Sequence, residues 1–276
     1  MSRGVRRGTT FPEFGKAPLQ PAPGGTTVTR LAGGWNELDR FELTDHVLPV
    51  AGLAEELTIL HLSDVHLRGP GPWVDRLCAL VSELPADLVV LTGDVVTRGY
   101  LPEVADQFLN ALPKSRLGTF AVIGNWEVWG GAPRQIWEAH LARHAIPLVH
   151  DRSVDLGGVT LVGTDDFLSG KPDLDAAFFG VDSDKPVVVL SHSPILFPEL
   201  VRPGVCLVLS GHTHAGQVRL PVVGPFFLPR GSGPYPGGWY RQGDAWLFVS
   251  RGIGWSIAPV RFRCPPELAR VRLVPG

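Results

Sequence analysis

The stretch His61-Leu62-Ser63-Asp64-Val65-His66 decides the interpretation of this chain, because it places two metal-ligand side chains directly after an apolar run. That run is Leu57-Thr58-Ile59-Leu60, whose aliphatic and β-branched residues predict a strand. Two further stretches also place ligand side chains directly after an apolar run: Leu91-Thr92-Gly93-Asp94 and Gly211-His212-Thr213-His214. Carboxylate oxygens and imidazole nitrogens are ligands of Zn, Mn and Fe, so the three stretches together predict a metal centre.

The first half of the chain alternates between two apolar patterns. Leu88–Leu91 and Phe120–Ile123 are continuous apolar runs, typical of strands that are buried on both faces. Apolar residues at helical spacing predict amphipathic helices over residues 74–81, 104–112 and 136–141. This alternation predicts a parallel-rich sheet covered by helices, with ligands bound beyond the carboxyl ends of the strands.

The second half is richer in strands than in helices. Five apolar runs predict strands, which we expect to form a second sheet packed on the first: Val159–Val162, Val187–Leu190, Cys206–Leu209, Trp246–Val249 and Leu268–Val274. Residues 1–34 contain four prolines and little periodicity, and they are expected to form a flexible N-terminal arm. Residues 35–276 are expected to form the folded domain.

The composition limits the classes of function. The 25 Lys and Arg residues and the 27 Asp and Glu residues give a formal net charge of −2, which argues against binding of long nucleic acid. Cys78, Cys206 and Cys264 are far apart, and the absence of a CxxC motif argues against a zinc ribbon or redox site. Arg6-Arg7 is followed by a Pro- and Gly-rich segment rather than an apolar one, which favours a cytoplasmic location.

Two more stretches complete an ordered set of motifs. Gly124-Asn125-Trp126-Glu127 and Ser191-His192-Ser193-Pro194 each follow an apolar run. The series D-x-H, G-D, G-N-x-E, H-x-P and G-H-x-H resembles the calcineurin-like metallophosphoesterase superfamily. Residues 211–217, together with the closing segments 248–254 and 260–267, resemble its YkuE-like branch. That branch includes enzymes that cleave UDP-diacylglucosamine.

The resemblance implies a four-layer α/β/β/α sandwich with two mixed β-sheets and a dinuclear metal site at the sheet edge. It assigns ligands to two divalent ions, with Asp94 bridging both: Asp64, His66, Asp94 and His214 for one ion, and Asp94, Asn125, His192 and His212 for the other. The mixed donor set does not choose among Mn, Fe and Zn.

The resemblance also implies the reaction. A hydroxide bridging the metals would attack phosphorus, which makes the chain a hydrolase of a phosphoester or pyrophosphate bond. The catalytic residues are then expected among the ligands: Asp64, Asp94, Asn125 and His212.

Trp126 departs from the family pattern, which has histidine after the asparagine. That histidine stabilises the phosphoryl oxygens or protonates the leaving group, whereas a tryptophan cannot titrate. Loss of a general acid typically costs about 10²–10⁴-fold in rate. We therefore expect Trp126 either to contact the substrate or to mark a catalytically weakened metal-binding scaffold. Glu127 is expected either to orient a metal ligand or to be a charge at a helix start.

Two further segments bear on the substrate. Asp165-Asp166 matches an Asp pair of the YkuE-like branch, and Asp166 is expected to orient a histidine, to contact substrate or to form a turn. The proline-broken apolar stretch 220–229 either packs on the core or contacts acyl chains and a membrane face through Phe226 and Phe227.

The expected substrate is thus a phosphorylated small molecule or a lipid-linked phosphate, bound by an enzyme peripheral to the membrane. A phosphodiesterase of cyclic nucleotides or oligonucleotides is the alternative enzyme.

Overall fold

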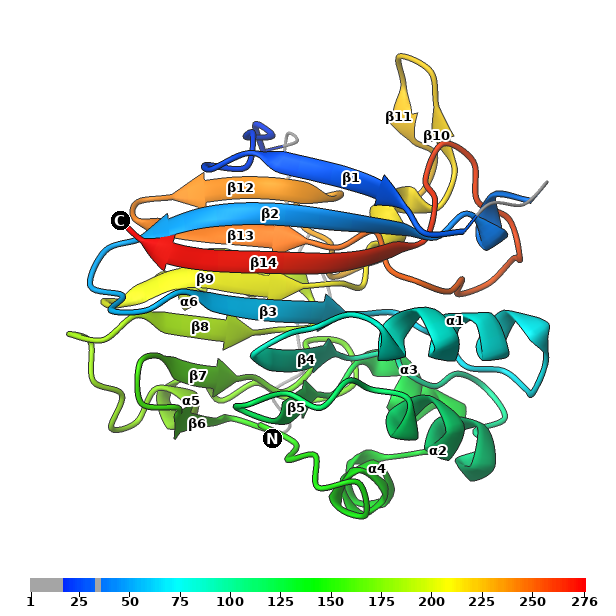
Figure 1. The fold of residues 1–276 in the computed structure, drawn as a ribbon, viewed down its shortest axis with the longest axis horizontal. Helices are drawn as coiled ribbons and strands as arrows, with labels where there is room; N and C mark the ends of the chain where they lie inside the picture. Colours follow the sequence, from blue (N-terminus) through cyan, green and yellow to red (C-terminus); the bar gives the residue numbers. More distant parts are fainter. Residues whose placement is uncertain (1–16, 33–35) are drawn as a thin grey trace, which may run out of the picture.

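Two six-stranded mixed sheets form the centre of the computed structural model, which describes residues 17–32 and 36–276 (Figure 1). The first sheet has the order β1 (Thr26–Arg30), β2 (Glu42–Val50), β14 (Glu267–Pro275), β3 (Leu57–Leu62), β4 (Leu88–Thr92) and β5 (Thr119–Val122). The second has the order β12 (Gly238–Gln242), β13 (Ala245–Val249), β9 (Val205–Ser210), β8 (Val187–Leu190), β7 (Thr160–Gly163) and β6 (Arg152–Asp155). A two-stranded hairpin, β10 (Arg219–Leu220) and β11 (Gly224–Pro225), protrudes from the body.

The helices lie outside the sheets. They are α1 (Pro72–Ser82), α2 (Pro102–Asn110), α3 (Asn125–Gly130), α4 (Arg134–Ala142), α5 (Leu174–Ala177) and α6 (Phe197–Leu200). Three short 3-10 turns add to them: η1 (Glu37–Asp39), η2 (Pro194–Leu196) and η3 (His214–Gly216). No helix in the described part of the chain has the length and apolar character needed to cross a membrane.

Three buried apolar layers hold the sandwich together. Leu60 and Leu62 of β3 pack toward α1, α2 and α4, whereas Ile59 of the same strand packs toward the second sheet. On the far face of that sheet, Val189 and Val208 pack with Phe197 of α6. Strands that are apolar on both faces are therefore buried on both faces, and the predicted α/β/β/α sandwich with two mixed sheets is confirmed.

The structure differs from the sequence-based expectation near both chain ends. β14 was expected in the second sheet but lies in the first, parallel to β2 and antiparallel to β3. Thr26–Arg30 was expected within the flexible arm, yet it forms β1 and pairs with β2. All five β1 residues are exposed, so this edge strand has no apolar pattern that could reveal it. Residues 1–16 and 33–34 of the expected arm lie outside the described residues.

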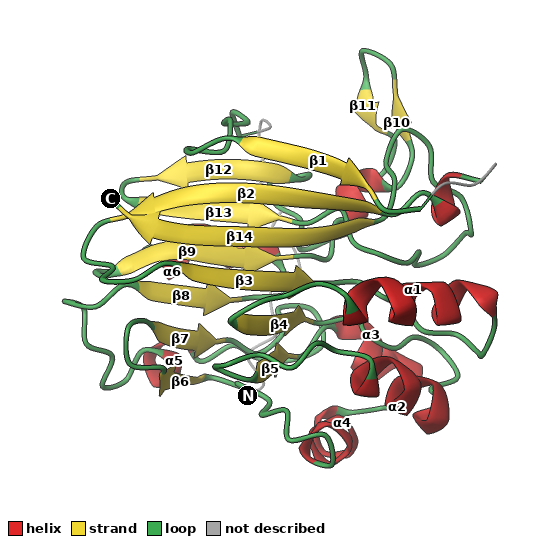
Figure 2. Ribbon diagram, viewed as in Figure 1, coloured by secondary structure: helices red, strands yellow, loops and turns green. Residues whose placement is uncertain are grey.

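The carboxyl ends of five strands meet at one edge. β3, β4 and β5 are parallel to one another, and so are β8 and β9 in the second sheet. The arrowheads of these strands point toward the side of the molecule that carries α1, α2 and α3 (Figure 2). Each strand ends within four residues of at least one predicted ligand. The five motifs found in the sequence therefore lie together at this edge of the sheets.

His61 links the stability of this fold to pH. It is fully buried on β3, its Nε2 lies 2.7 Å from Thr92 Oγ1, and burial lowers its pKa to about 3. The folded state therefore binds this proton less readily than the unfolded state, and the fold loses stability as pH falls from 6.5 toward about 3. We predict that His61→Leu flattens this loss in urea unfolding measured across that pH range. Equal slopes for wild type and variant would contradict the prediction.

Candidate metal centre

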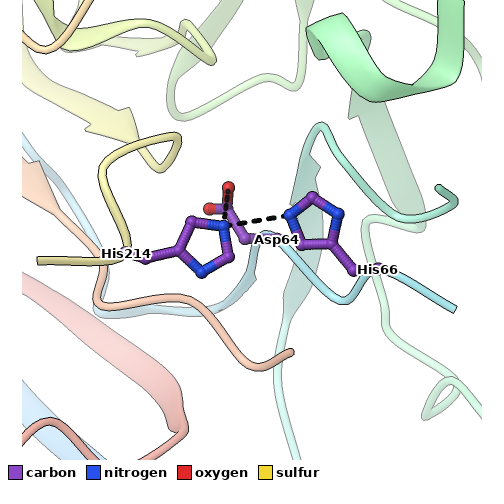
Figure 3. A group of neighbouring side chains, drawn as sticks. All are labelled: Asp64, His66 and His214. Atoms are coloured by element: carbon purple, nitrogen blue, oxygen red, sulfur yellow. Dashed lines mark hydrogen bonds and ion pairs between the residues drawn. The ribbon is translucent and has the colours of Figure 1, made fainter. Parts of the chain in front are cut away.

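The first group of predicted ligands consists of Asp64, His66 and His214, all buried (Figure 3). His214 Nε2 lies 2.9 Å from His66 Nε2 and 3.4 Å from Asp64 Oδ1. The backbone N–H of His212 donates to both oxygens of Asp64, at 3.0 and 2.9 Å, which fixes the carboxylate. Two ring nitrogens and a carboxylate oxygen that face one another this closely are a donor set for a divalent transition-metal ion.

The second group consists of Asp94, His192 and His212, joined by Asn125. His192 Nε2 lies 3.3 Å from Asp94 Oδ2, 3.2 Å from Asn125 Oδ1 and 3.2 Å from His212 Nδ1. Burial alone would lower the pKa of His192, but the charges of Asp94 and Asp64 raise this pKa well above its usual value. The group therefore favours a positive charge at this point, and its oxygen and nitrogen donors fit a cation.

Backbone carbonyls orient two of the histidine rings. His192 Nδ1 lies 2.7 Å from the Thr92 carbonyl oxygen, and His212 Nε2 lies 2.6 Å from that of Arg230. A ring nitrogen that donates to a carbonyl leaves the lone pair of the opposite nitrogen free to bind a metal. Burial lowers the pKa of His212 to about 4, so this ring is neutral at pH 7, as a ligand must be.

Asp94 lies between the two groups. Its Oδ2 is 3.7 Å from His66 Nε2 in the first group and 3.3 Å from His192 Nε2 in the second. Its Oδ1 accepts a hydrogen bond of 2.8 Å from the backbone N–H of Trp126. Burial alone would raise the pKa of Asp94, but the charge and hydrogen bond of His192 hold it below its usual value. The ionised carboxylate thus has the position that a bridging ligand needs.

The backbone is strained where it carries predicted ligands. Left-handed φ values of 49° to 70° occur at five of them: Asp64, His66, Asp94, His212 and His214. Residues other than glycine rarely adopt this backbone conformation, which costs of order 1–3 kcal/mol for each residue. Such strain is concentrated at functional sites. Gly124 shows how tightly the loops pack, since a Cβ there would lie 2.3 Å from Asp94 Oδ1.

Glu127 is buried and holds two loops in place. Its Oε2 accepts from the backbone N–H groups of Asp94 and Gly124, at 2.9 and 2.8 Å. Its Oε1 accepts from those of Val95 and Val96, at 2.6 and 3.3 Å. The carboxylate therefore positions the backbone of Asp94. Glu127 also lies in the first turn of α3, so its position fits both roles that the sequence left open.

Asp166 forms a turn, which is one of the roles expected from the sequence. It is fully buried, and its carboxylate accepts from Leu168 N–H at 3.0 Å, Ser169 N–H at 2.7 Å and Ser193 Oγ at 3.1 Å. These loop donors occupy the carboxylate, and the substrate contact stays a prediction. Asp166 also connects the loop after β7 to the residue that follows His192.

Trp126 lies in the wall of a cavity of about 610 Å³ that opens over both groups. Asp94, Asn125, His212 and His214 also border this cavity. The indole of Trp126 meets the ring of Trp129 edge to face, with centroids 5.9 Å apart. The sequence did not identify several wall residues. Phe167, Arg230 and Ile257 lie on irregular loops without periodicity, and Trp129 lies on the short helix α3.

Comparison with known proteins gives the family. A model of the calcineurin-like phosphoesterases matches residues 57–216, more than half of the chain. The chain belongs to the calcineurin-like phosphoesterase family. It is therefore a metallophosphoesterase-family hydrolase, and the resemblance found in the sequence is confirmed.

Relatives of this phosphoesterase include bacterial proteins of similar length or longer. An uncharacterized metallophosphoesterase of Helicobacter pylori is 32% identical over 255 residues, which cover 88% of this chain and 66% of that protein. The uncharacterized metallophosphoesterase YkuE of Bacillus subtilis is 25% identical, covering 83% of this chain and 84% of its own. The phosphodiesterase YaeI of Escherichia coli is 28% identical, and the match covers 87% of this chain and 89% of YaeI. This phosphoesterase thus spans just under two thirds of the Helicobacter protein.

We predict that Glu127→Gln weakens metal binding by this phosphoesterase. The glutamine amide group would face N–H groups that now donate to Glu127, so about 1–3 kcal/mol of stability is lost. Residues that hold ligands in place typically contribute about 10–100-fold in metal affinity. Mn²⁺ titration calorimetry and urea unfolding measure both effects, with the exposed Glu83→Gln as the matched control. Equal Mn²⁺ affinity in the two variants would refute the positioning role.

Proposed function

We propose that this phosphoesterase uses two divalent ions, of Mn, Fe or Zn, to hydrolyse a phosphoester or pyrophosphate bond. Seven side chains would hold the ions: Asp64, His66, Asp94, Asn125, His192, His212 and His214. Ions bound there supply a nucleophile from water at neutral pH and neutralise charge on the phosphoryl oxygens. The observation that carries the proposal is the position of Asp94 Oδ2, within 3.7 Å of His66 Nε2 and 3.3 Å of His192 Nε2.

The cavity supports an orientation for the substrate. Asp94, Asn125 and His212 border it where the phosphoryl group would bind, and Trp126 and Trp129 form part of its wall. A phosphoryl group bound at the polar end would place the remainder of the substrate against aromatic side chains. Such walls exclude water and favour substrates with an apolar or aromatic part.

The rim of the cavity supports a lipid-linked substrate. Phe226 and Phe227, next to the β10–β11 hairpin, are 75% and 60% exposed, and Ile257 on the adjoining loop is 80% exposed. Phe262 N–H donates to the Gln217 carbonyl at 3.0 Å, which joins that loop to the hairpin segment.

The charge of this rim fits an anionic surface. Residues 214–240 contain Arg219 and Arg230 but no Asp, Glu or Lys. Exposed apolar side chains together with arginines are typical of surfaces that dock on anionic lipid. We therefore propose peripheral contact with a membrane through Phe226 and Phe227. The cytoplasmic location stays a prediction.

Hydrolysis of bis-p-nitrophenyl phosphate tests the proposed function. We predict Mn²⁺-dependent turnover that falls at least about 100-fold in Asp94→Asn, because loss of the bridging carboxylate removes several kcal/mol of transition-state stabilisation. The fully exposed Asp244→Asn is the matched control, and circular dichroism verifies that both variants are folded. Binding of two Mn²⁺ ions without turnover would instead support the metal-binding scaffold that Trp126 raises as an alternative.

Liposome co-sedimentation tests the membrane contact. We predict that the double variant Phe226→Ser/Phe227→Ser binds liposomes of anionic phospholipid several-fold more weakly than wild type, since apolar area buried in the interface contributes to binding. Phe179→Ser is the matched control, because Phe179 is 85% exposed but does not border the cavity. Equal binding of wild type and the double variant would rule out this contact.

A further inference from the structure

Another cluster of metal-ligand side chains lies outside the candidate metal centre, where α2 and α4 meet (Figure 1). It consists of Asp106 on α2 and of His140 and His144 at the C-terminal end of α4. His144 N–H donates to the Leu141 carbonyl at 2.9 Å, so the helical turn continues to this residue. Residues four positions apart on a helix share one face, and both rings can therefore reach the same point.

Both rings converge on one oxygen of Asp106. Asp106 Oδ1 lies 3.0 Å from His140 Nε2 and 2.6 Å from His144 Nε2. The two rings are stacked, with centroids 5.5 Å apart and an angle of 23° between their planes. Ligand atoms bound about 2.0–2.1 Å from a tetrahedral Zn²⁺ ion lie about 3.3 Å apart. The two contacts therefore need to open by less than about 1 Å to hold such an ion.

His140 is buried, with 4% of its surface exposed, and its hydrogen bonding is incomplete. Its Nε2 has no hydrogen-bond partner in the described part of the chain, since the contact with Asp106 Oδ1 is not aligned for one. Buried polar atoms without a partner are rare, and an ion is one of the explanations for them.

The surroundings of His140 suit a metal ligand. The Tyr100 hydroxyl forms a hydrogen bond with Nδ1, a contact that orients the ring and leaves Nε2 for an ion. Burial and the charge of Arg143 lower the pKa of His140, so its ring is neutral at pH 7, as a ligand must be.

Arg143 supplies the positive charge next to Asp106 in this structure. Its Nη2 lies 3.1 Å from Asp106 Oδ1 and 2.9 Å from His140 Nδ1. The Arg143 side chain is 58% exposed, and exposed ion pairs contribute little net stability. A divalent ion with three protein ligands can therefore replace it. The unpaired carbonyls at the end of α4 also favour a cation at this point.

We infer that Asp106, His140 and His144 bind a Zn²⁺ ion, which takes the place of the Arg143 guanidinium. Water would complete the tetrahedral ligand set. Two imidazole nitrogens and one carboxylate favour Zn²⁺ over Mn²⁺, because affinity for such sites rises along the first-row metals.

The ion would join α2 to α4 at a distance from the predicted catalytic ligands. Tyr100 lies on the segment that leads from Asp94 to α2, and its N–H donates to the carbonyl of Gly130 at the end of α3 at 3.4 Å. The cluster therefore braces the helices that follow β4 and β5, and this inference does not rest on the proposed function.

Metal counting on the full chain tests this inference. Each protein is dialysed against the same buffered concentration of free Zn²⁺, and bound zinc is measured by inductively coupled plasma mass spectrometry. We expect wild type to bind one equivalent of Zn²⁺ more than His144→Gln or Asp106→Asn, because each variant removes one ligand. Both positions are partly exposed, and both variants leave the buried His140 in place.

Glu138→Gln is the matched control, because Glu138 is an exposed carboxyl group of α4 outside the cluster. It should bind as much zinc as wild type. Equal zinc counts in wild type, His144→Gln and Asp106→Asn would overturn the inference. The comparison does not depend on how many ions the candidate metal centre binds, so this result would leave the proposed function intact. Dialysis against Mn²⁺ should give equal counts in wild type and His144→Gln, and one extra Mn²⁺ in wild type would contradict the preference for Zn²⁺.

Arg143→Gln tests the displacement of the guanidinium. Removing this charge should let the additional equivalent bind at a free Zn²⁺ concentration several-fold lower than in wild type. The binding curve of this equivalent is the difference between each protein and the same protein carrying His144→Gln. Arg241→Gln, an exposed arginine of β12, should match wild type. An unchanged or higher concentration in Arg143→Gln would contradict the displacement.

Anomalous diffraction at the zinc edge locates the ion without any variant. In wild-type crystals soaked with Zn²⁺, we expect a peak about 2.0–2.1 Å from His140 Nε2, His144 Nε2 and one oxygen of Asp106. The absence of a peak among these side chains, at a Zn²⁺ concentration that saturates binding in solution, would overturn the inference.

Discussion

The Asp94 carboxylate is the group on which both halves of the candidate site depend, because one oxygen faces His66 and His192 at once. Its position follows from a left-handed backbone, from the Glu127 carboxylate that accepts its N–H, and from the absence of a side chain at Gly124. The first sheet supplies four of the predicted ligands, Asp64, His66, Asp94 and Asn125, and the second supplies His192, His212 and His214. The site therefore forms only when the two sheets pack, which makes the apolar layer between them part of its construction.

The central strands and the positions of most ligands could be predicted from the sequence, because strands buried on both faces appear as continuous apolar runs. The runs at Leu88–Thr92 and Val187–Leu190 are completely buried, so every residue is apolar or neutral and the strand ends are visible. Polar residues directly after such runs must lie at the carboxyl edge of the sheet. The pairing of His66 with His214, 148 positions apart, has no local signal, and only the family resemblance supplied it.

The remaining features depend on tertiary contacts that the sequence does not encode locally. An apolar run does not specify its neighbours, and so β14 was assigned to the wrong sheet. Asp166 follows a strand as the ligands do, but loop donors occupy its carboxylate. Arg230 lies on an irregular segment and Trp129 on the short helix α3, and only the folded chain brings them to the cavity wall. The metal groups thus follow from regular structure, whereas the features that select a substrate come from loops.

The central claim is that Asp94 bridges two metal ions, and anomalous diffraction from crystals grown with Mn²⁺ tests it most directly. The account predicts two anomalous peaks about 3.5–4 Å apart. One peak should contact His66 and His214, the other should contact His192 and His212, and the Asp94 carboxylate should contact both. A single peak, or two peaks of which only one contacts Asp94, would contradict it.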